Sequence, residues 1–185
     1  MSRGLGDVYK RQLFIYSSVD GHTLKICKHM MAKNKSSATM NIHSLETVTP
    51  QDLDSNEIIV IGASIRYGNH REELYNFINK NVAVLDEKNS YFFSVNAVAR
   101  KIEKRSPEVN TYIKKFKKNV RWSPKKIQVF PGKIDYPKYN FLDKHMVRLI
   151  MYFSGGPTDL SKSYEFTDWK EVDRFADEIL ESDIK

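Results

Sequence analysis

The feature that most constrains this chain is a regular alternation of short apolar runs with helical segments. The clearest run is Ile58-Ile59-Val60-Ile61, which is wholly β-branched and is followed by Gly62. A strand of this composition is buried on both faces, as in parallel sheets that are covered by helices. Further strand candidates bounded by turn residues lie at 13–16, 39–43, 91–95 and 127–130, the last stopped by Pro131-Gly132.

Helical periodicity fills the intervals between these runs. Residues 107–118 start with Pro107, which suits the first turn of a helix. Strands and helices that alternate at this spacing form parallel βαβ units, and five strands predict a doubly wound α/β sheet of order 2-1-3-4-5. The expected inward faces are Leu24, Cys27 and Met31 in helix 23–33, Leu74, Phe77 and Ile78 in helix 72–79, and Trp169, Val172, Phe175, Ala176, Ile179 and Leu180 in a last helix from about Asp168.

One amphipathic helix is additional to this plan and precedes the last helix, within residues 136–156. Its apolar stripe consists of Leu142, Met146, Leu149 and Phe153, and Gly155-Gly156 can supply its C-terminal cap. The final turn, residues 149–153, is apolar all round. A helix packed on a globular core needs no such excess.

The length of 185 residues suits one domain, which we expect over residues 13–181. Residues 1–12 show neither strand nor helix periodicity and no secretory pattern, so we expect a leader that is disordered or an artefact of sequence assembly. No apolar run approaches the roughly 20 residues that cross a bilayer. Cys27 is the one cysteine, which indicates a reducing compartment. The five histidines lack metal-ligand spacing, so we expect no metal site.

Positive charge is concentrated in the middle of the chain. Residues 100–148 carry 15 Lys or Arg against 4 Asp or Glu, whereas residues 1–99 carry 11 against 10. This segment should attract anions, whether carboxylate substrates, nucleic acid or an acidic lipid surface. A solvated helix face is the simpler interpretation for the lysines of 114–118.

Three loops should meet at one edge of the sheet, because the loops after strands 1, 3 and 4 converge where the strand order reverses. The loop Ser17–Thr23 is rich in hydroxyls and opens a helix, so it can hold a phosphate; an N-cap with a tight turn at Asp20-Gly21 is the alternative. Residues 62–68 offer small residues and then Tyr67, which could stack on a flat ring or be a surface aromatic. Residues 94–100, at the end of the fourth strand, likewise offer small residues that allow a ligand to approach the backbone closely.

Six segments carry a resemblance to a known family: SSVDGHT, VIGASIRYGNH, FFSVNAVARKIEKRSPEVNTY, the turn Tyr136-Pro137-Lys138-Tyr139, LIMYFSGGPTD and FTDW. They are distributed along nearly the whole stretch from Leu13 to Leu180. They resemble the bacterial flavodoxin-like, quinone-dependent protoporphyrinogen IX dehydrogenases, the oxygen-independent type of protoporphyrinogen oxidase. The run ASIRYG followed by SVNAVARK is highly specific to this group, and the phosphate loop alone is less so.

The resemblance implies a flavodoxin-like fold and FMN, with phosphate on the first loop and isoalloxazine between the other two. It implies the six-electron oxidation of protoporphyrinogen IX to protoporphyrin IX in heme biosynthesis, with electrons passing to menaquinone or ubiquinone at the cytoplasmic face of the bacterial inner membrane. The implied cofactor-binding residues are Ser17, Ser18, Val19, Asp20, Gly21, His22, Thr23, Ala63, Ser64, Ile65, Arg66, Tyr67, Gly68, Ser94, Val95, Asn96, Ala97, Val98, Ala99 and Arg100.

Residue chemistry adds to these expectations. The propionates of the substrate should bind Arg100, Lys101, Lys104 and Arg105, and the apolar end of the extra helix suits lipid or quinone. We expect Asp20, which would repel phosphate, to turn outward and accept bonds from nearby backbone N–H groups. No residue stands out as catalytic acid or base, although His22 and His70 lie near the flavin loops in sequence.

Other functions remain open at this point. An NAD(P)H:quinone reductase and a flavodoxin-type electron carrier are the nearest alternatives, although the chain shows no second nucleotide fingerprint. Nucleic-acid binding through the basic segment is a third, but no known nucleic-acid module is present, so we expect no nucleic-acid partner. Whether the protein forms a homo-oligomer is also open.

Overall fold

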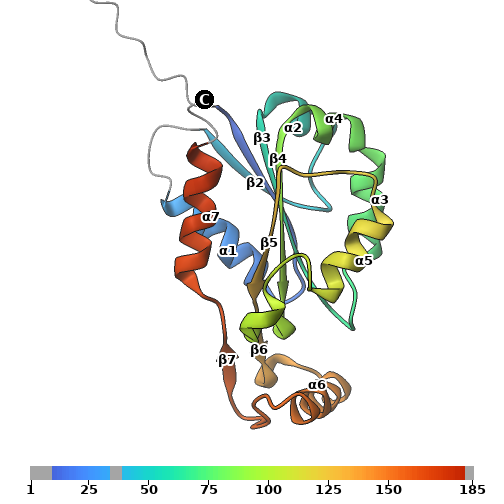
Figure 1. The fold of residues 1–185 in the computed structure, drawn as a ribbon, viewed down its shortest axis with the longest axis vertical. Coiled ribbons are helices and arrows are strands. Elements are labelled where there is room, and N and C mark those ends of the chain that lie inside the picture. Colours follow the sequence, from blue (N-terminus) through green and yellow to red (C-terminus); the bar gives the residue numbers. More distant parts are fainter. Residues whose placement is uncertain (1–9, 34–38, 182–185) are drawn as a thin grey trace, which may run out of the picture.

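The computed structural model describes residues 10–33 and 39–181. Five parallel strands form the main sheet in the order β2-β1-β3-β4-β5, which confirms the predicted doubly wound topology (Figure 1). The strands are β1 (Gln12–Ser17), β2 (Met40–Ser44), β3 (Ile58–Ser64), β4 (Asn89–Asn96) and β5 (Lys126–Pro131). Pro131 is tolerated because β5 is an edge strand, where a missing N–H breaks no ladder.

Helices cover both faces of this sheet. One face carries α1 (His22–Lys33) and α7 (Trp169–Glu181), and the other carries α2 (Pro50–Ser55), α3 (Glu72–Lys80), α4 (Val82–Glu87) and α5 (Thr111–Asn119) (Figure 1). The predicted run at β3 explains this arrangement, since Ile59 and Ile61 join the core under α3 and α5, whereas Ile58 and Val60 join the core under α1 and α7.

A smaller layer extends beyond the carboxyl end of β5. It contains β6 (Lys133–Asp135) paired antiparallel with β7 (Ser163–Glu165), the 3₁₀ turn η3 (Tyr136–Lys138) and the helix α6 (Phe141–Phe153) (Figure 1). Two further 3₁₀ turns, η1 (Ala97–Arg100) and η2 (Ile102–Lys104), follow β4. The predicted additional helix is therefore present, whereas the β6–β7 pair was not predicted.

The predicted cap of α6 is also confirmed. Gly155 has φ +69°, and the N–H groups of Gly155 and Gly156 donate to the carbonyls of Tyr152 (3.3 Å) and Met151 (2.7 Å). This is the pattern of a Schellman motif. Only part of the helix is buried: Met151 packs with Ile134 and Tyr136 in a small core of its own.

Several boundaries and faces differ from the prediction. The buried face of α1 is Thr23, Ile26, Cys27 and Met30, so Leu24 was wrongly placed inward. Met31 of α1 and Phe77 of α3 are half-buried and pack against the core on their side of the sheet, as predicted. The helix predicted from Pro107 starts at Thr111, because Asn110 accepts bonds from the N–H groups of Tyr112 and Ile113 and caps it there.

The boundary expected at Leu13 also moves. Gln12 is part of β1 and is buried, and the carbonyl of Arg11 accepts the N–H groups of Glu57 and Ile58 at 2.9 and 3.1 Å. Gln12 therefore belongs to the sheet rather than to a leader, and Arg11 bonds to the residues at the start of β3. Residues 1–9 of the expected leader lie outside the described residues.

Candidate functional site

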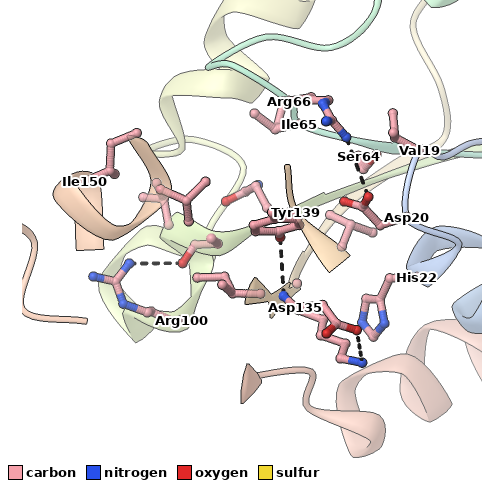
Figure 2. Close-up of a pocket in the computed structure, with 18 of the residues that line it drawn as sticks. Val19, Asp20, His22, Ser64, Ile65, Arg66, Arg100, Asp135, Tyr139 and Ile150 are labelled. Atoms are coloured by element: carbon pink, nitrogen blue, oxygen red, sulfur yellow. Dashed lines mark hydrogen bonds and ion pairs between the residues drawn. The ribbon is translucent and has the colours of Figure 1, made fainter. Parts of the chain in front are cut away.

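A pocket of about 720 Å³ lies at the carboxyl ends of the strands. The loops after β1, β3, β4 and β5 line it on one side, and α6 lines it on the other (Figure 2). This is the edge at which ligands bind doubly wound sheets. The pocket volume is in the range of small-molecule and cofactor sites.

The loop after β1 leads directly into the N-terminus of α1. Gly21 has φ +77°, and its N–H donates to the Ser18 hydroxyl at 3.0 Å. The Thr23 hydroxyl is buried at the start of the helix and has no hydrogen-bond partner among the described residues. A free hydroxyl beside the unpaired N–H groups of a helix N-terminus is suited to an anionic group such as phosphate.

Asp20 contradicts the expectation that it turns away from the site. It lines the pocket, and its carboxylate lies 3.5 Å from Nη1 of Arg66, which comes from the loop after β3 (Figure 2). The partner of this carboxylate is therefore the Arg66 guanidinium and not the nearby backbone N–H groups that were expected. A phosphate bound to this loop therefore meets a paired carboxylate.

The loop after β3 makes a tight turn at Tyr67 and Gly68. Both residues have positive φ, +49° and +75°, and Arg66 and Asn69 exchange backbone hydrogen bonds of 2.9 and 3.1 Å across them. Positive φ at both central positions is the requirement of a type I′ turn. Tyr67 is 61% exposed and lines the pocket, and its hydroxyl donates to Asp143 of α6 at 2.6 Å.

The loop after β4 holds a second unpartnered polar atom. The Asn96 side-chain oxygen accepts the Ala99 N–H at 3.0 Å and so caps η1. Its amide nitrogen is buried and has no partner within the described ranges, although Asn96 lines the pocket. Such a donor is suited to a carbonyl or ring nitrogen of a bound ligand.

Most predicted binding residues meet in this pocket. Those that do not line it are Ser17, Thr23, Ala63, Ser94 and Ala99, which are buried behind the lining residues, and Arg105. The predicted residues that line it are Ser18, Val19, Asp20, Gly21, His22, Ser64, Ile65, Arg66, Tyr67, Gly68, Val95, Asn96, Ala97, Val98, Arg100, Lys101 and Lys104.

The four predicted propionate ligands divide into two pairs. Arg105 donates to the Ala99 carbonyl at 3.0 Å and lies 3.2 Å from Glu171, whereas Arg100 donates to the Ser154 carbonyl and hydroxyl at 2.8 Å. Both guanidinium groups are thus engaged within the fold. Lys101 and Lys104 are exposed on the pocket rim, and neither ammonium has a partner among the described residues.

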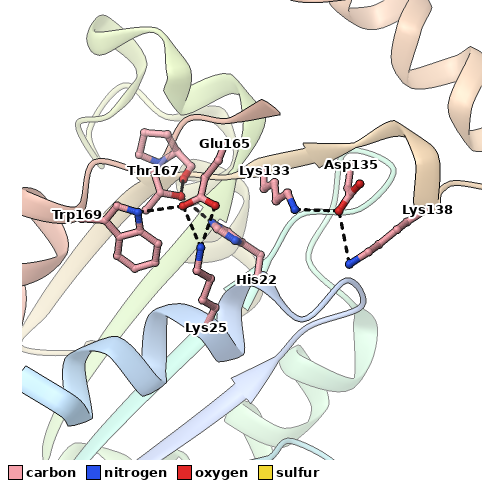
Figure 3. Close-up of polar contacts among 9 residues, drawn as sticks. His22, Lys25, Lys133, Asp135, Lys138, Glu165, Thr167 and Trp169 are labelled. Carbon is pink, nitrogen blue, oxygen red and sulfur yellow. Dashed lines mark hydrogen bonds and ion pairs between the residues drawn. The ribbon is translucent and has the colours of Figure 1, made fainter. Parts of the chain in front are cut away.

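Sequence reasoning missed the contribution of the segment after β5. Lys133 and Lys138 both pair with Asp135, at 2.8 and 3.5 Å, and hydrogen bonds from Lys133 and Ser163 lower the pKa of Asp135 to about 2 (Figure 3). Tyr139 lies near the centre of the view of the pocket in Figure 2. The turn 136–139 was noted as a matching segment, and its place after a strand end was the signal that could have assigned it to the site.

Of the two histidine candidates, one lines the pocket and the other does not. His22 lines the pocket, and its Nε2 lies 2.6 Å from the Thr167 hydroxyl (Figure 3). Because that hydroxyl donates its proton to the Pro131 carbonyl, His22 donates from Nε2, and burial lowers the pKa of His22. His70 is not a pocket residue: it is buried against Phe92 and Phe116, and burial lowers its pKa to about 4.

No helix within the described residues combines the length and apolarity that crossing a bilayer requires. No cluster of His, Cys, Asp and Glu side chains within them could hold a metal ion.

Comparisons with known proteins agree with this geometry. Residues 13–161 match the model of the Flavodoxin domain family. A protein of Escherichia coli (strain K12) named protoporphyrinogen IX dehydrogenase (quinone) is 39% identical over 173 residues, which cover 91% of this chain and 94% of that protein. A protein of the same name from Leishmania major is 35% identical over 169 residues, covering 90% of this chain and 73% of that protein.

The fold comparison points the same way. The crystal structure of oxidised flavodoxin 1 from Bacillus cereus superposes with a TM-score of 0.52 at 11% identity, and the match covers 92% of this chain and 97% of that chain. At this identity the likeness concerns the fold. Together with the sequence matches, it shows that the chain belongs to the flavodoxin-like family of quinone-dependent protoporphyrinogen IX dehydrogenases.

Proposed function

We propose that this protein binds FMN and oxidises protoporphyrinogen IX to protoporphyrin IX, passing the electrons to menaquinone or ubiquinone. The relatives are named for this substrate and for a quinone. The observation that carries the proposal is the pocket itself, which joins a polar half built from the loops of a flavodoxin-like sheet to an apolar half built from α6. Such a pocket suits a flavin next to a macrocycle.

The polar half fits FMN. The Thr23 hydroxyl and the Asn96 amide nitrogen are buried donors without partners in the described chain, at the two loops where phosphate and ring would lie. Gly21 and Gly68 hold positive φ at this edge. When bound, FMN supplies a two-electron acceptor that is reduced by the porphyrinogen and reoxidised by the quinone.

The apolar half fits a tetrapyrrole. Ile134, Met146, Val147, Ile150 and Met151 line it, which gives a macrocycle an apolar wall. The ammonium groups of Lys101 and Lys104 stand at its rim and are free to pair with two carboxylates. We therefore assign propionate binding to these two lysines rather than to Arg100 or Arg105, whose guanidinium groups hold backbone and carboxylate partners.

His22 is the titratable pocket residue whose neighbours best suit proton transfer. It donates from Nε2 to Thr167, and its lowered pKa keeps the ring neutral near pH 7. A neutral imidazole with a free Nδ1 can accept a proton released as the porphyrinogen is oxidised. No hydrogen bond in the described chain occupies that atom.

The outer side of α6 supports a proposal of membrane contact. Leu142, Leu149, Tyr152 and Phe153 expose 57–79% of their surface there. A cluster of this kind marks a contact surface, and the neighbouring basic residues favour anionic lipid. We propose peripheral attachment at the cytoplasmic face of the inner membrane, where α6 would meet a quinone dissolved in the bilayer.

Anaerobic mixing tests the proposed chemistry. Protoporphyrinogen added to the FMN-loaded protein should bleach the flavin absorbance in one turnover, and Lys101→Ala/Lys104→Ala should weaken substrate binding about tenfold or more with little change in the limiting rate. Lys80→Ala/Lys88→Ala, which removes two lysines that do not line the pocket, is the matched control. No bleaching by protoporphyrinogen, with rapid bleaching by NADPH, would instead identify an NAD(P)H:quinone reductase. Bleaching without turnover on quinone would indicate a carrier.

A further inference from the structure

The helix α6 is tied at its N-terminal end to the loop after β3. Asp143, in the first turn, is 7% exposed and accepts hydrogen bonds from Arg66 Nη2 at 2.7 Å and the Tyr67 hydroxyl at 2.6 Å. Asn140 adds a third bond at 3.0 Å and also caps the helix. Charge-assisted bonds to a buried carboxylate at a helix N-terminus are strong and fix geometry.

The C-terminal end of α6 is tied to the loop after β4. Arg100 Nη2 donates to the Ser154 carbonyl and hydroxyl, both at 2.8 Å, and Nη1 donates to the Ala97 carbonyl at 3.2 Å. Ser154 is the C-cap of α6 and Ala97 begins η1. A guanidinium at the helix C-terminus neutralises the partial negative charge of the last carbonyls.

These two ties connect α6 to the loops that flank the polar half of the pocket. Between the ties, the main apolar contacts of α6 are those of Met151 and Val147 with Ile134 and Tyr136, which belong to the small layer and not to the five-stranded sheet. Figure 1 shows α6 lying beyond the strand ends, close to η1 and β6. Asp143 and Arg100 therefore make the polar contacts that join the helix to the loops of the five-stranded sheet.

The backbone of the β3 loop depends on the same contact. Tyr67 has φ +49°, a conformation that costs a residue with a Cβ about 1 kcal/mol or more. Its hydroxyl bond to Asp143 helps to offset this cost. Arg66, between Asp20 at 3.5 Å and Asp143 at 2.7 Å, extends the connection to the loop after β1. The loops after β1 and β3 thus share one polar network with the N-terminal turn of α6, and the loop after β4 makes a separate polar contact with the C-terminal end of the helix.

We propose that Asp143 and Arg100 are positioning residues that couple the placement of α6 to flavin binding. The apolar wall for the substrate is then held in place by the loops that hold the flavin. Coupling of this kind is reciprocal. If FMN binding stabilises the docked position of α6 by some factor, then a docked helix strengthens FMN binding by the same factor. A variant that loosens α6 should therefore bind FMN more weakly. This inference rests on the proposed function for the identity of the flavin and the substrate.

A spin label on α6 tests the coupling without enzyme activity. Leu149→Cys places a reactive thiol on an exposed position outside the pocket, and Cys27, the native cysteine, is fully buried. In the otherwise wild-type chain, FMN should further immobilise the label. With Asp143→Asn the label should be more mobile even before FMN is added, and the FMN Kd should rise about tenfold.

Two further variants separate positioning from folding and from charge. Tyr67→Phe removes a single hydroxyl at a mostly exposed side chain and should act in the same direction as Asp143→Asn with a smaller effect. Arg100→Lys keeps the positive charge but loses the two-point contact with Ser154, so it should also free the label. The control is Asp159→Asn, which removes an exposed carboxylate outside the pocket.

Steady-state kinetics provides the second measurement. At saturating FMN, Asp143→Asn should raise the KM for protoporphyrinogen about tenfold or more and change kcat by less than about threefold. If Asp143→Asn and Arg100→Lys both kept the label mobility and the FMN affinity of the wild type, the proposed coupling would be wrong. If the wild-type protein failed to oxidise protoporphyrinogen, the proposed function would be wrong, while label mobility and FMN titration would still decide the coupling.

Discussion

At the scale of single residues, the most informative atoms are the buried polar atoms without partners. A buried hydroxyl or amide that makes no hydrogen bond costs about 1–3 kcal/mol, so it is uncommon without a reason. Asn96 lines the proposed flavin pocket, and the Thr23 hydroxyl lies directly behind the lining of the proposed phosphate loop. We interpret them as donors whose partner is the cofactor.

Thr23→Val tests this interpretation. The hydroxyl has no partner in the described protein, so the apoprotein should keep its free energy of unfolding or gain slightly. The FMN Kd should rise about tenfold or more, since a bond to a charged phosphate is lost. Fluorescence titration of FMN measures the affinity. Thr47→Val, whose hydroxyl bonds Ser44 away from the pocket, should leave it unchanged, and equal Kd values for all three proteins would contradict the assignment.

His70 makes stability depend on pH. Burial lowers its pKa to about 4 in the folded chain, below the ordinary value of 6.5, so the unfolded chain binds the proton more readily. The free energy of unfolding should therefore be fully retained above pH 6.5 and fall by about 3 kcal/mol as the pH decreases to 4.

Urea denaturation at pH 7 and pH 4.5 measures this dependence. His70→Gln, which cannot titrate, should flatten it across that interval, whereas His145→Gln at an exposed position of α6 should not. An identical pH dependence in the wild type and His70→Gln would show that other groups cause the loss.

At the scale of elements, the strands were the most predictable part. Their β-branched and aromatic runs are local signals, and strand alternation with helices restricts the sheet to few orders. The inward face of α1 was not predictable, because Leu24, Ile26, Cys27, Met30 and Met31 are apolar on more than one side of the helix. Packing against the sheet and the distant α7 selects the face that is buried.

The site shows the same division between local and long-range information. The three binding loops could be predicted because each follows a visible strand end. Asp143 could not, since its partner Arg66 lies 77 residues earlier and an acidic residue in an amphipathic helix normally faces water. Nor could the contacts of Arg100 with Ser154 and of Arg105 with Glu171, because they join chain segments that only folding brings together.

Gly62→Ala tests the packing between β3 and β4. A Cβ at this position would lie 2.1 Å from the ring of Phe93, inside van der Waals contact, so the ring or a strand must shift. We expect a loss of about 1–3 kcal/mol in the free energy of unfolding, measured by urea denaturation. In a background that already carries Phe93→Leu, Gly62→Ala should cost less free energy of unfolding than it costs in the wild type, because the ring is no longer there. Additive losses would show that the ring is not the obstacle.

At the scale of the whole molecule, the pocket, the apolar helix α6 and part of the basic segment lie at one end, while the remainder of that segment, with α5 and β5, runs along the sheet (Figure 1). The strand ends open toward α6 (Figure 1), and α6 adds exposed apolar side chains to a segment, residues 100–148, that carries 15 Lys or Arg against 4 Asp or Glu. At this end of the molecule, basic side chains can therefore attract an anionic bilayer and apolar side chains of α6 can insert into it.

Liposome flotation tests this orientation. The wild type should float with vesicles that contain anionic lipid, and Leu149→Glu/Phe153→Glu should abolish most of this binding. Val109→Glu, an exposed apolar position outside α6, is the control and should float like the wild type. Raising the salt concentration should weaken the binding, since part of it is electrostatic. Equal flotation of the double variant and the wild type would rule out docking through α6.

The most direct measurement of the central claim is anaerobic turnover of protoporphyrinogen IX by the FMN-loaded protein with excess menaquinone or ubiquinone. The proposed function predicts that porphyrin fluorescence rises steadily to many equivalents per protein, that one porphyrin forms for every three quinones reduced, and that omitting FMN or quinone stops it. No porphyrin beyond the amount formed without protein, with flavin and quinone both present, would contradict it.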